Sequence, residues 1–159
     1  MGRYMKKVAP LEAILWSIAF PGFPQLLSGK YIKGFLFLFL EFLVNGQSHF
    51  NKAIMLSFLG DTRLAGEIVN YQWLMFYPCI YMFAMWDAYK NSLERESQFS
   101  YIPFAFAAYF VTIGLMYSPI VTIKNRLIGP IFLPILFIIP GLVAGFFIRY
   151  ILIKIRGSM

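Results

Sequence analysis

Glu41 is the residue whose type and position most clearly suggest chemistry. It lies in a run of Phe and Leu, where an ionisable group is costly to place at membrane depth and therefore faces protein or water. At 100° per residue on a helix, Glu41, Asn45, Ser48 and Lys52 fall within about 60° of one another, and His49 lies beside them. This polar stripe suggests an ion or proton path in which Glu41 titrates and His49 relays the proton.

A helix that ends near Asn45 and Gly46 is the alternative interpretation. Glu41 would then lie near a membrane interface, and the polar residues that follow it would form a loop outside the membrane. The apolar run 34–44 is too short to cross a bilayer alone, whereas a single helix over 34–59 is long enough. The sequence leaves both interpretations open.

Asp87 is the second carboxylate of interest, because it sits at the end of an apolar stretch. We expect it to pair with Lys30, Lys33 or Lys90 and so hold the N-terminal segment to the rest of the chain. The alternative is a site for a cationic substrate. Cys79 has apolar neighbours, which predicts a packed, inert thiol.

Enzyme signatures are absent from the sequence. The single histidine excludes paired histidine ligands within one chain, and no nucleophile or phosphate-binding motif occurs. We therefore expect no catalytic residues, no metal site and no cofactor.

Composition places the chain in a membrane. Of 159 residues, 60% are hydrophobic and only 13% are charged, against about 25% charged in soluble domains. A chain this short buries only about two-thirds of its surface when it folds, so lipid is the natural solvent for the remainder. The net charge of +7 comes from basic residues scattered between apolar runs, which argues against nucleic acid as a partner.

The apolar runs predict an all-α fold, a single membrane domain over 1–159. We expect an N-terminal Pro-Gly hairpin over 1–33 that is retained in the mature protein, a cytoplasmic tail over 154–159, and four candidate spans: 34–59, 71–89, 101–117 and 131–153. Gly141 and Gly145 form a small-xxx-small pair that predicts close helix packing.

The distribution of positive charge selects the topology. If the first segment crosses fully, the chain has five spans and the basic residues divide seven against seven. If it is a re-entrant or interfacial hairpin bent at Pro21 and Gly22, the division is ten against four. The second arrangement obeys the positive-inside rule and predicts a multi-pass plasma-membrane protein with both termini cytoplasmic.

A family resemblance supports this membrane location. Pro21, Gly22, Gln25, Gly29, Lys33 and Gly34, followed much later by Asp87 and Tyr89, fit a known signature. The chain resembles small bacterial multi-pass membrane proteins with a Pro-Gly-x-Gly-Gln-x-Tyr-x-Gly…Lys-Gly motif and a later Asp-Ala-Tyr, distantly related to the two-transmembrane-helix domain family. Pro24 and Leu27 depart from it, standing where glycine and tyrosine are usual. The resemblance implies a fold and a membrane location but no activity.

Three functions remain open from the sequence. The preferred one is a non-catalytic accessory or assembly partner that acts through helix contacts, with exposed small-residue seams binding a membrane-protein partner or a second copy. The second is a small oligomeric transporter or channel that uses the polar stripe around Glu41, and it requires that stripe to face a wet cavity. The third is a membrane-embedded lipid enzyme.

Overall fold

The protein is built from nine helices and one short pair of strands in the part of the chain that the structure describes. The computed structural model describes residues 8–95 and 97–157. The helices, in chain order, are α1 (Pro10–Ala19), α2 (Phe23–Leu27), α3 (Tyr31–Ser48), α4 (Phe50–Phe58), α5 (Thr62–Ile68), α6 (Tyr71–Leu74), α7 (Tyr77–Ser92), α8 (Ile102–Tyr117) and α9 (Gly129–Gly157). The expectation of an all-α fold is confirmed.

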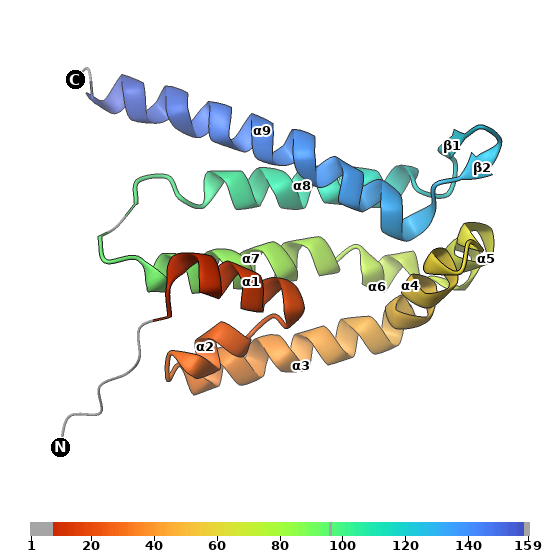
Figure 1. Ribbon diagram of the computed structural model, residues 1–159, viewed down its shortest axis with the longest axis horizontal. Helices are drawn as coiled ribbons and strands as arrows, with labels where there is room; N and C mark the ends of the chain where they lie inside the picture. Colours follow the sequence, from red (N-terminus) through yellow and green to blue (C-terminus); the bar gives the residue numbers. More distant parts are fainter. Residues whose placement is uncertain (1–7, 96, 158–159) are drawn as a thin grey trace.

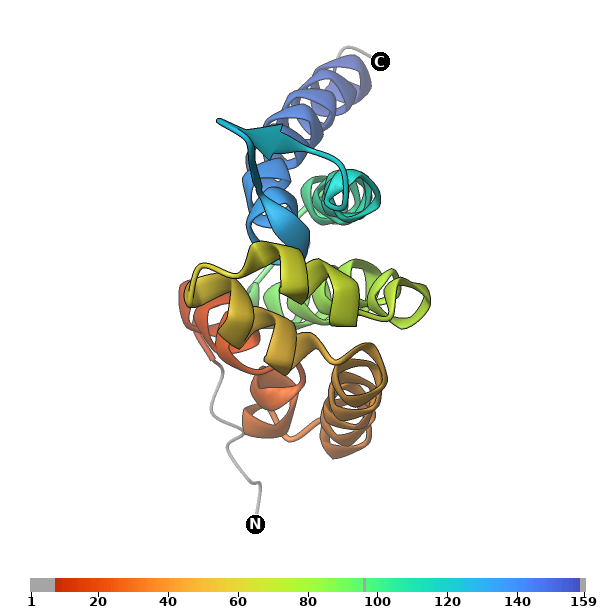
Figure 2. The same cartoon turned by 90° about the vertical axis from the view of Figure 1, so that its right-hand side faces the viewer.

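The four longest helices run alternately in opposite directions along the molecule (Figure 1). Helices α3 and α8 run from the end that carries the two termini toward the opposite end, whereas α7 and α9 run back. The short helices α4, α5 and α6 cover the opposite end. Seen end-on, α8 and α9 lie to one side of α7, while α2 and α3 lie to the other (Figure 2).

The N-terminal segment folds into a helical hairpin. Pro10 begins α1 at a position where its missing N–H is not needed, and the chain then turns at Gly22, which has a left-handed φ of 96°. Helix α2 returns toward the end from which α3 begins (Figure 1). The bend therefore lies where the sequence predicted it, at Pro21 and Gly22. The first seven residues of the 1–33 range lie outside the described part of the chain.

Helix α3 ends at Ser48. One of the two sequence interpretations required a single helix over 34–59, and the structure does not contain it. His49 adopts a left-handed φ of 58° and separates α3 from α4. A left-handed residue at a helix C-terminus satisfies the last carbonyls, and the His49 N–H bonds the carbonyls of Asn45 and Gly46. The helix thus stops two residues beyond the alternative prediction.

The structure divides the predicted span 71–89 into two helices but matches the predicted span 101–117 closely. The 71–89 range contains two helices, because α6 is a single turn capped by the Asn70 side chain, and α7 begins afresh with Pro78 in its first turn and continues to Ser92. The 101–117 range corresponds to α8 within one residue.

Helix α9 is 29 residues long and continues through Pro134 and Pro140 to Gly157. The predicted tail over 154–159 is therefore helical as far as Gly157. By length and composition, α9 is the one helix among the described residues that could cross a membrane unaided; α1 and α8 are apolar but shorter. A two-residue turn, Lys124 and Asn125, joins strands β1 (Thr122–Ile123) and β2 (Arg126–Leu127) just before it.

Glycines allow α8 and α9 to pack at very short range. A Cβ at Gly145 would lie 2.6 Å from the Cα of Pro103, and one at Gly141 would lie 2.9 Å from the Cα of Ala107. Gly114 of α8 meets α9 in the same way. The prediction of helix packing at Gly141 and Gly145 is confirmed, but the seam is buried within the chain, so it is not exposed to a partner as we had expected.

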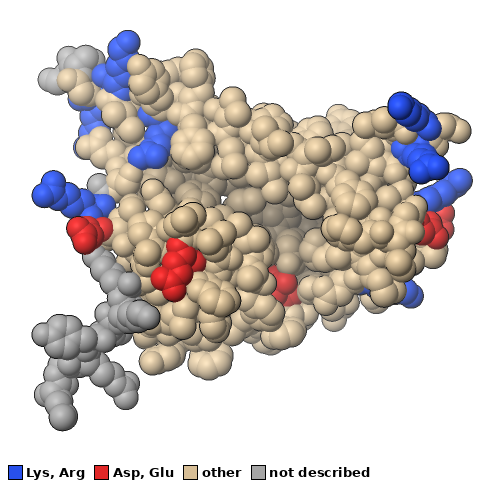
Figure 3. Space-filling view, in the orientation of Figure 1, with Lys and Arg blue, Asp and Glu red and all other residues tan. Residues whose placement is uncertain are grey.

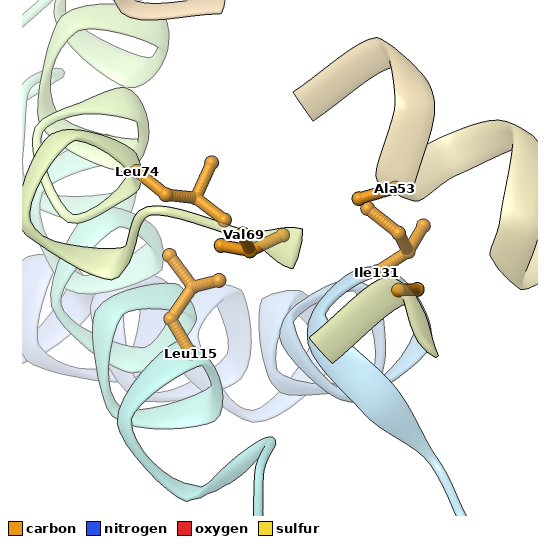
Figure 4. Packing of buried hydrophobic residues seen from close by; sticks show 6 residues of the cluster. Ala53, Val69, Leu74, Leu115 and Ile131 are labelled. Atoms are coloured by element: carbon orange, nitrogen blue, oxygen red, sulfur yellow. The ribbon is translucent and has the colours of Figure 1, made fainter. Parts of the chain in front are cut away.

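The larger buried hydrophobic cluster lies at the end of the molecule opposite the termini, and a smaller one joins Val8, Ala13 and Ala88. Five residues from five helices, together with Val69 just after α5, form the larger cluster: Ala53, Ala65, Val69, Leu74, Leu115 and Ile131 (Figure 4). Along the rest of the molecule, large apolar side chains of α3 and α9, such as Phe39, Phe42, Ile139 and Phe147, are more than half exposed. In the space-filling view, Lys and Arg gather at the two ends and leave a band between them free of positive charge (Figure 3).

Candidate functional site

Asp87 is the centre of a polar junction between the hairpin, α3 and α7. It is 7% exposed, and its Oδ1 accepts from Lys33 Nζ at 2.6 Å. Its Oδ2 accepts from Gln25 Nε2 at 3.2 Å and from Asn91 Nδ2 at 3.0 Å, while Gln25 Nε2 also donates to the Ala84 carbonyl at 2.9 Å. The predicted pairing of Asp87 with a basic residue near the hairpin is confirmed, with Lys33 as the partner.

The backbone of the hairpin touches α3 where glycines leave room. A Cβ at Gly22 would lie 2.5 Å from the Gly34 carbonyl oxygen, and one at Gly34 would lie 2.4 Å from Leu26 Cδ2. The hairpin is therefore attached to the main helices at one place, through Gly22, Gln25, Lys33 and Gly34.

The remaining residues of the sequence signature lie around this junction. Pro21 is buried in the turn, and Gly29 takes a left-handed φ of 74° between α2 and α3. Tyr89 points elsewhere, since its ring packs against Phe104 of α8 at 5.8 Å. Lys90, one of the three partners considered for Asp87, lies over the Trp86 ring, with Nζ 5.5 Å from its centroid.

A large cleft separates the hairpin, α3 and α7 from the α8–α9 pair. Its volume is about 970 Å³, and its walls come from α1, α3, α4, α6, α7, α8 and α9. Figure 3 shows a hollow at the centre of this face, within the band free of positive charge. Most of the lining is apolar, including Ile135, Ile138 and Leu142 of α9.

Glu41 lines this cleft. Its Oε1 accepts a hydrogen bond from the Tyr77 hydroxyl at 2.7 Å, and the Asn45 side chain, one turn further along α3, also interacts with the carboxylate. Tyr81, one turn after Tyr77 on α7, lines the cleft as well. Glu41 is the only acidic, basic or histidine side chain among the described residues that line the cleft.

Of the rest of the predicted stripe, Asn45 lines the cleft, whereas Ser48, His49 and Lys52 do not. Asn45 also exchanges two hydrogen bonds with Asn51, each 3.1 Å long. Ser48 is fully buried and donates to the Asn45 carbonyl, whereas His49 and Lys52 are exposed. The predicted relay between Glu41 and His49 gains no support, because the left-handed turn at His49 places it outside the cleft-lining residues.

Five aromatic rings share the lining of the cleft with Glu41. Phe50 and Tyr77 lie 4.6 Å apart between ring centroids, and Tyr77 stacks on Tyr81 at 5.4 Å. Phe20 of the hairpin meets Phe42 of α3 edge-on at 6.0 Å. All five rings line the cleft, and Tyr77, which contacts both Phe50 and Tyr81, joins them to the carboxylate.

Tyr77 and Tyr81 are the site residues that sequence reasoning missed. Thirty-six residues separate Tyr77 from Glu41, and no local periodicity connects them. The apolar setting of Cys79 predicted a packed thiol, and this prediction is wrong because Cys79 is exposed on α7. Within residues 8–95 and 97–157, no three His, Cys, Asp or Glu side chains are grouped closely enough to hold a metal ion.

Comparison of the chain with protein-family models, with curated proteins and with solved structures finds no match.

Proposed function

We propose that this chain is a multi-pass membrane protein that binds an apolar or amphiphilic small molecule in its central cleft. The four crossing segments are α3, α6–α7, α8 and α9, and the α1–α2 hairpin enters the membrane and returns. At 1.5 Å per residue, the 18 residues of α3 span about 27 Å and the 16 of α8 about 24 Å, against a hydrocarbon core of about 30 Å.

The distribution of charge supports this topology. Among the described residues, seven basic residues lie at the end with the termini: Lys30, Lys33, Lys90, Arg95, Arg149, Lys154 and Arg156. Four lie at the other end: Lys52, Arg63, Lys124 and Arg126. The positive-inside rule then places both termini in the cytoplasm, with the plasma membrane as the location.

The exposed apolar surface supports membrane embedding independently of charge. Ile139, Val143 and Phe147 follow one another along α9 at helical spacing, and each is more than 60% exposed. Soluble monomers rarely expose contiguous apolar patches of this kind. Lipid chains would cover these side chains at no cost.

The cleft is the single observation that carries the binding function. Its volume lies at the upper end of the range of about 300–1,000 Å³ found for small-molecule sites, which are mostly apolar with a few polar groups. Binding fits better than catalysis, because Glu41 is the only carboxylate in the lining and no histidine or cysteine joins it. We place assembly through helix contacts second, since the Gly141 and Gly145 seam is occupied within the chain.

We further propose that the family resemblance reflects the hairpin junction. Gln25, Lys33 and Asp87 belong to the signature, and Gln25 and Lys33 each donate to the Asp87 carboxylate, 62 and 54 residues away in the sequence. A shared signature at these positions would conserve the attachment of the hairpin and would not specify a ligand.

Photolabelling with a diazirine-bearing hexadecanol in liposomes tests the binding function. We expect wild-type protein to be labelled at cleft residues such as Tyr77 and at lipid-facing residues such as Phe147. Gly46 lines the cleft, and a Cβ there meets nothing within 4 Å, so Gly46→Trp should narrow the cleft and remove labelling at Tyr77 alone. Gly157→Trp, whose Cβ also meets nothing, is the matched control outside the cleft. Equal labelling of Tyr77 in both variants would refute the proposal.

Cysteine accessibility tests the topology. Cys79 is the only cysteine, so Cys79→Ser provides a background for single cysteines at Lys30, Lys124 and Arg156. An impermeant thiol reagent applied to intact cells should label the cysteine at position 124, and those at 30 and 156 only after the cells are opened. Labelling of position 30 and of a tag at the N-terminus from opposite sides would exclude four spans.

A further inference from the structure

The Glu41 carboxylate faces the cleft without a basic side chain opposite it. The described ion pairs join Lys33 to Asp87 and Arg63 to Glu67. Among residues 8–95 and 97–157, no Lys or Arg lines the cleft. The hydrogen bond from Tyr77 stabilises the carboxylate but does not neutralise it. An ionised carboxylate in an apolar setting is stabilised most by an opposite charge placed nearby.

The aromatic rings near Glu41 also favour a positively charged ligand. Phe42, Phe50, Tyr77 and Tyr81 line the cleft beside it, and the faces of such rings attract cations within about 6 Å of their centroids. A carboxylate set among aromatic rings is suited to an organic cation, whose diffuse charge loses less hydration than that of a metal ion.

The shape of the cleft defines the rest of the ligand. Apart from Glu41, Asn45, Asn51 and the two tyrosine hydroxyls, the lining is apolar. It is formed by residues such as Ile135, Ile138 and Leu142 of α9 and Met82 and Met85 of α7. Methionine side chains adapt to irregular apolar shapes. A volume of about 970 Å³ accommodates bulky apolar substituents in addition to a charged centre.

We propose that the cleft binds a lipophilic organic cation, with its charged centre beside Glu41 and its apolar substituents against α9. This inference rests on the proposed binding function and specifies its ligand class. A neutral lipid chain is the alternative occupant, and it would make no use of the carboxylate.

Tetraphenylphosphonium and tetraphenylborate provide a matched test, because they have nearly the same shape and opposite charges. Binding to the purified full-length protein in detergent is measured by equilibrium dialysis for wild type, Glu41→Gln and Glu12→Gln. Glu41→Gln keeps a hydrogen-bond acceptor for Tyr77. Glu12 is an exposed carboxylate of α1 outside the cleft, so Glu12→Gln removes the same charge elsewhere.

We expect Glu41→Gln to weaken tetraphenylphosphonium binding by about tenfold, leave tetraphenylborate binding unchanged or stronger, and differ from Glu12→Gln in both respects. Gly46→Trp should abolish binding of the cation. If wild type binds both ions equally and Glu41→Gln changes neither, the cleft does not select charge and the inference is overturned. Loss of both ions in Gly46→Trp would then still support the proposed function, so the two failures are distinguishable.

Discussion

Replacement of Asp87 tests whether its carboxylate holds the hairpin to the main helices. Asp87→Ala removes the acceptor for Lys33, Gln25 and Asn91 and leaves the buried Gln25 amide nitrogen with the Ala84 carbonyl alone. Hydrogen bonds to an ionised group contribute about 1.5–3 kcal/mol each when buried. The Lys33 side chain is 53% exposed, so its ion pair adds about 1 kcal/mol or less.

We therefore expect Asp87→Ala to lower the free energy of unfolding by about 3 kcal/mol, and Lys33→Ala by about 1 kcal/mol or less. Reversible unfolding by SDS in mixed micelles, followed by tryptophan fluorescence, measures both values. In the double variant, the coupling energy should be about 0.5–1 kcal/mol, because the two groups share one contact.

Hydrogen exchange locates the effect of the Asp87 replacement. If the junction is what fails, amides of residues 22–30 should exchange faster in Asp87→Ala, while those of the α8–α9 pair should not change. Glu94→Ala, which removes an exposed carboxylate just after α7, is the control. The reasoning is refuted if Asp87→Ala is no more destabilising than Lys33→Ala, or if exchange rises equally throughout the chain.

Four further substitutions probe backbone and side-chain contacts in the same unfolding assay. Gly145→Ala should destabilise the protein by about 1–3 kcal/mol, because its Cβ would meet the Pro103 backbone. Gly46→Ala should stabilise it by about 0.5–1 kcal/mol, because a Cβ there meets nothing and alanine favours the helix. Equal effects of the two substitutions would contradict the packing of α8 on α9. His49→Gly should stabilise by about 0.5 kcal/mol by relieving the left-handed φ, and a loss of stability would argue that its imidazole has a structural role. Tyr77→Phe should cost about 1–2 kcal/mol, and no cost would mean that its hydrogen bond to Glu41 contributes nothing to the fold.

The sequence predicted those elements whose geometry depends only on residues close to one another in the chain. Proline fixes its own φ, and glycine permits a left-handed φ that other residues avoid, so Pro21 and Gly22 predict a turn whatever the rest of the chain does. Glycines spaced four apart fall on one face of any helix, which is why Gly141 and Gly145 were recognisable as a packing seam. The sequence did not show which helix packs against that seam, because the same glycine spacing would suit a helix of a partner protein and α8.

The polar stripe shows where such local reasoning ends. Its helical period holds only as long as the helix continues, and the left-handed residue at His49 ends α3 within the stripe. Histidine does not favour that conformation strongly enough to be read as a stop signal. The periodicity therefore united Glu41 and Asn45, which share the cleft, with Ser48 and His49, which do not.

By itself, the sequence determined the helical class, the apolar character and the hairpin turn, because each follows from composition or from contacts within a few residues. Only the tertiary structure decided that Lys33, rather than Lys30 or Lys90, pairs with Asp87, and that Tyr77 donates to Glu41. These pairs lie 54 and 36 residues apart, and three basic residues of similar character were equally available to Asp87. The cleft likewise exists only between packed helices, since its lining is drawn from seven of them and no single segment carries its shape.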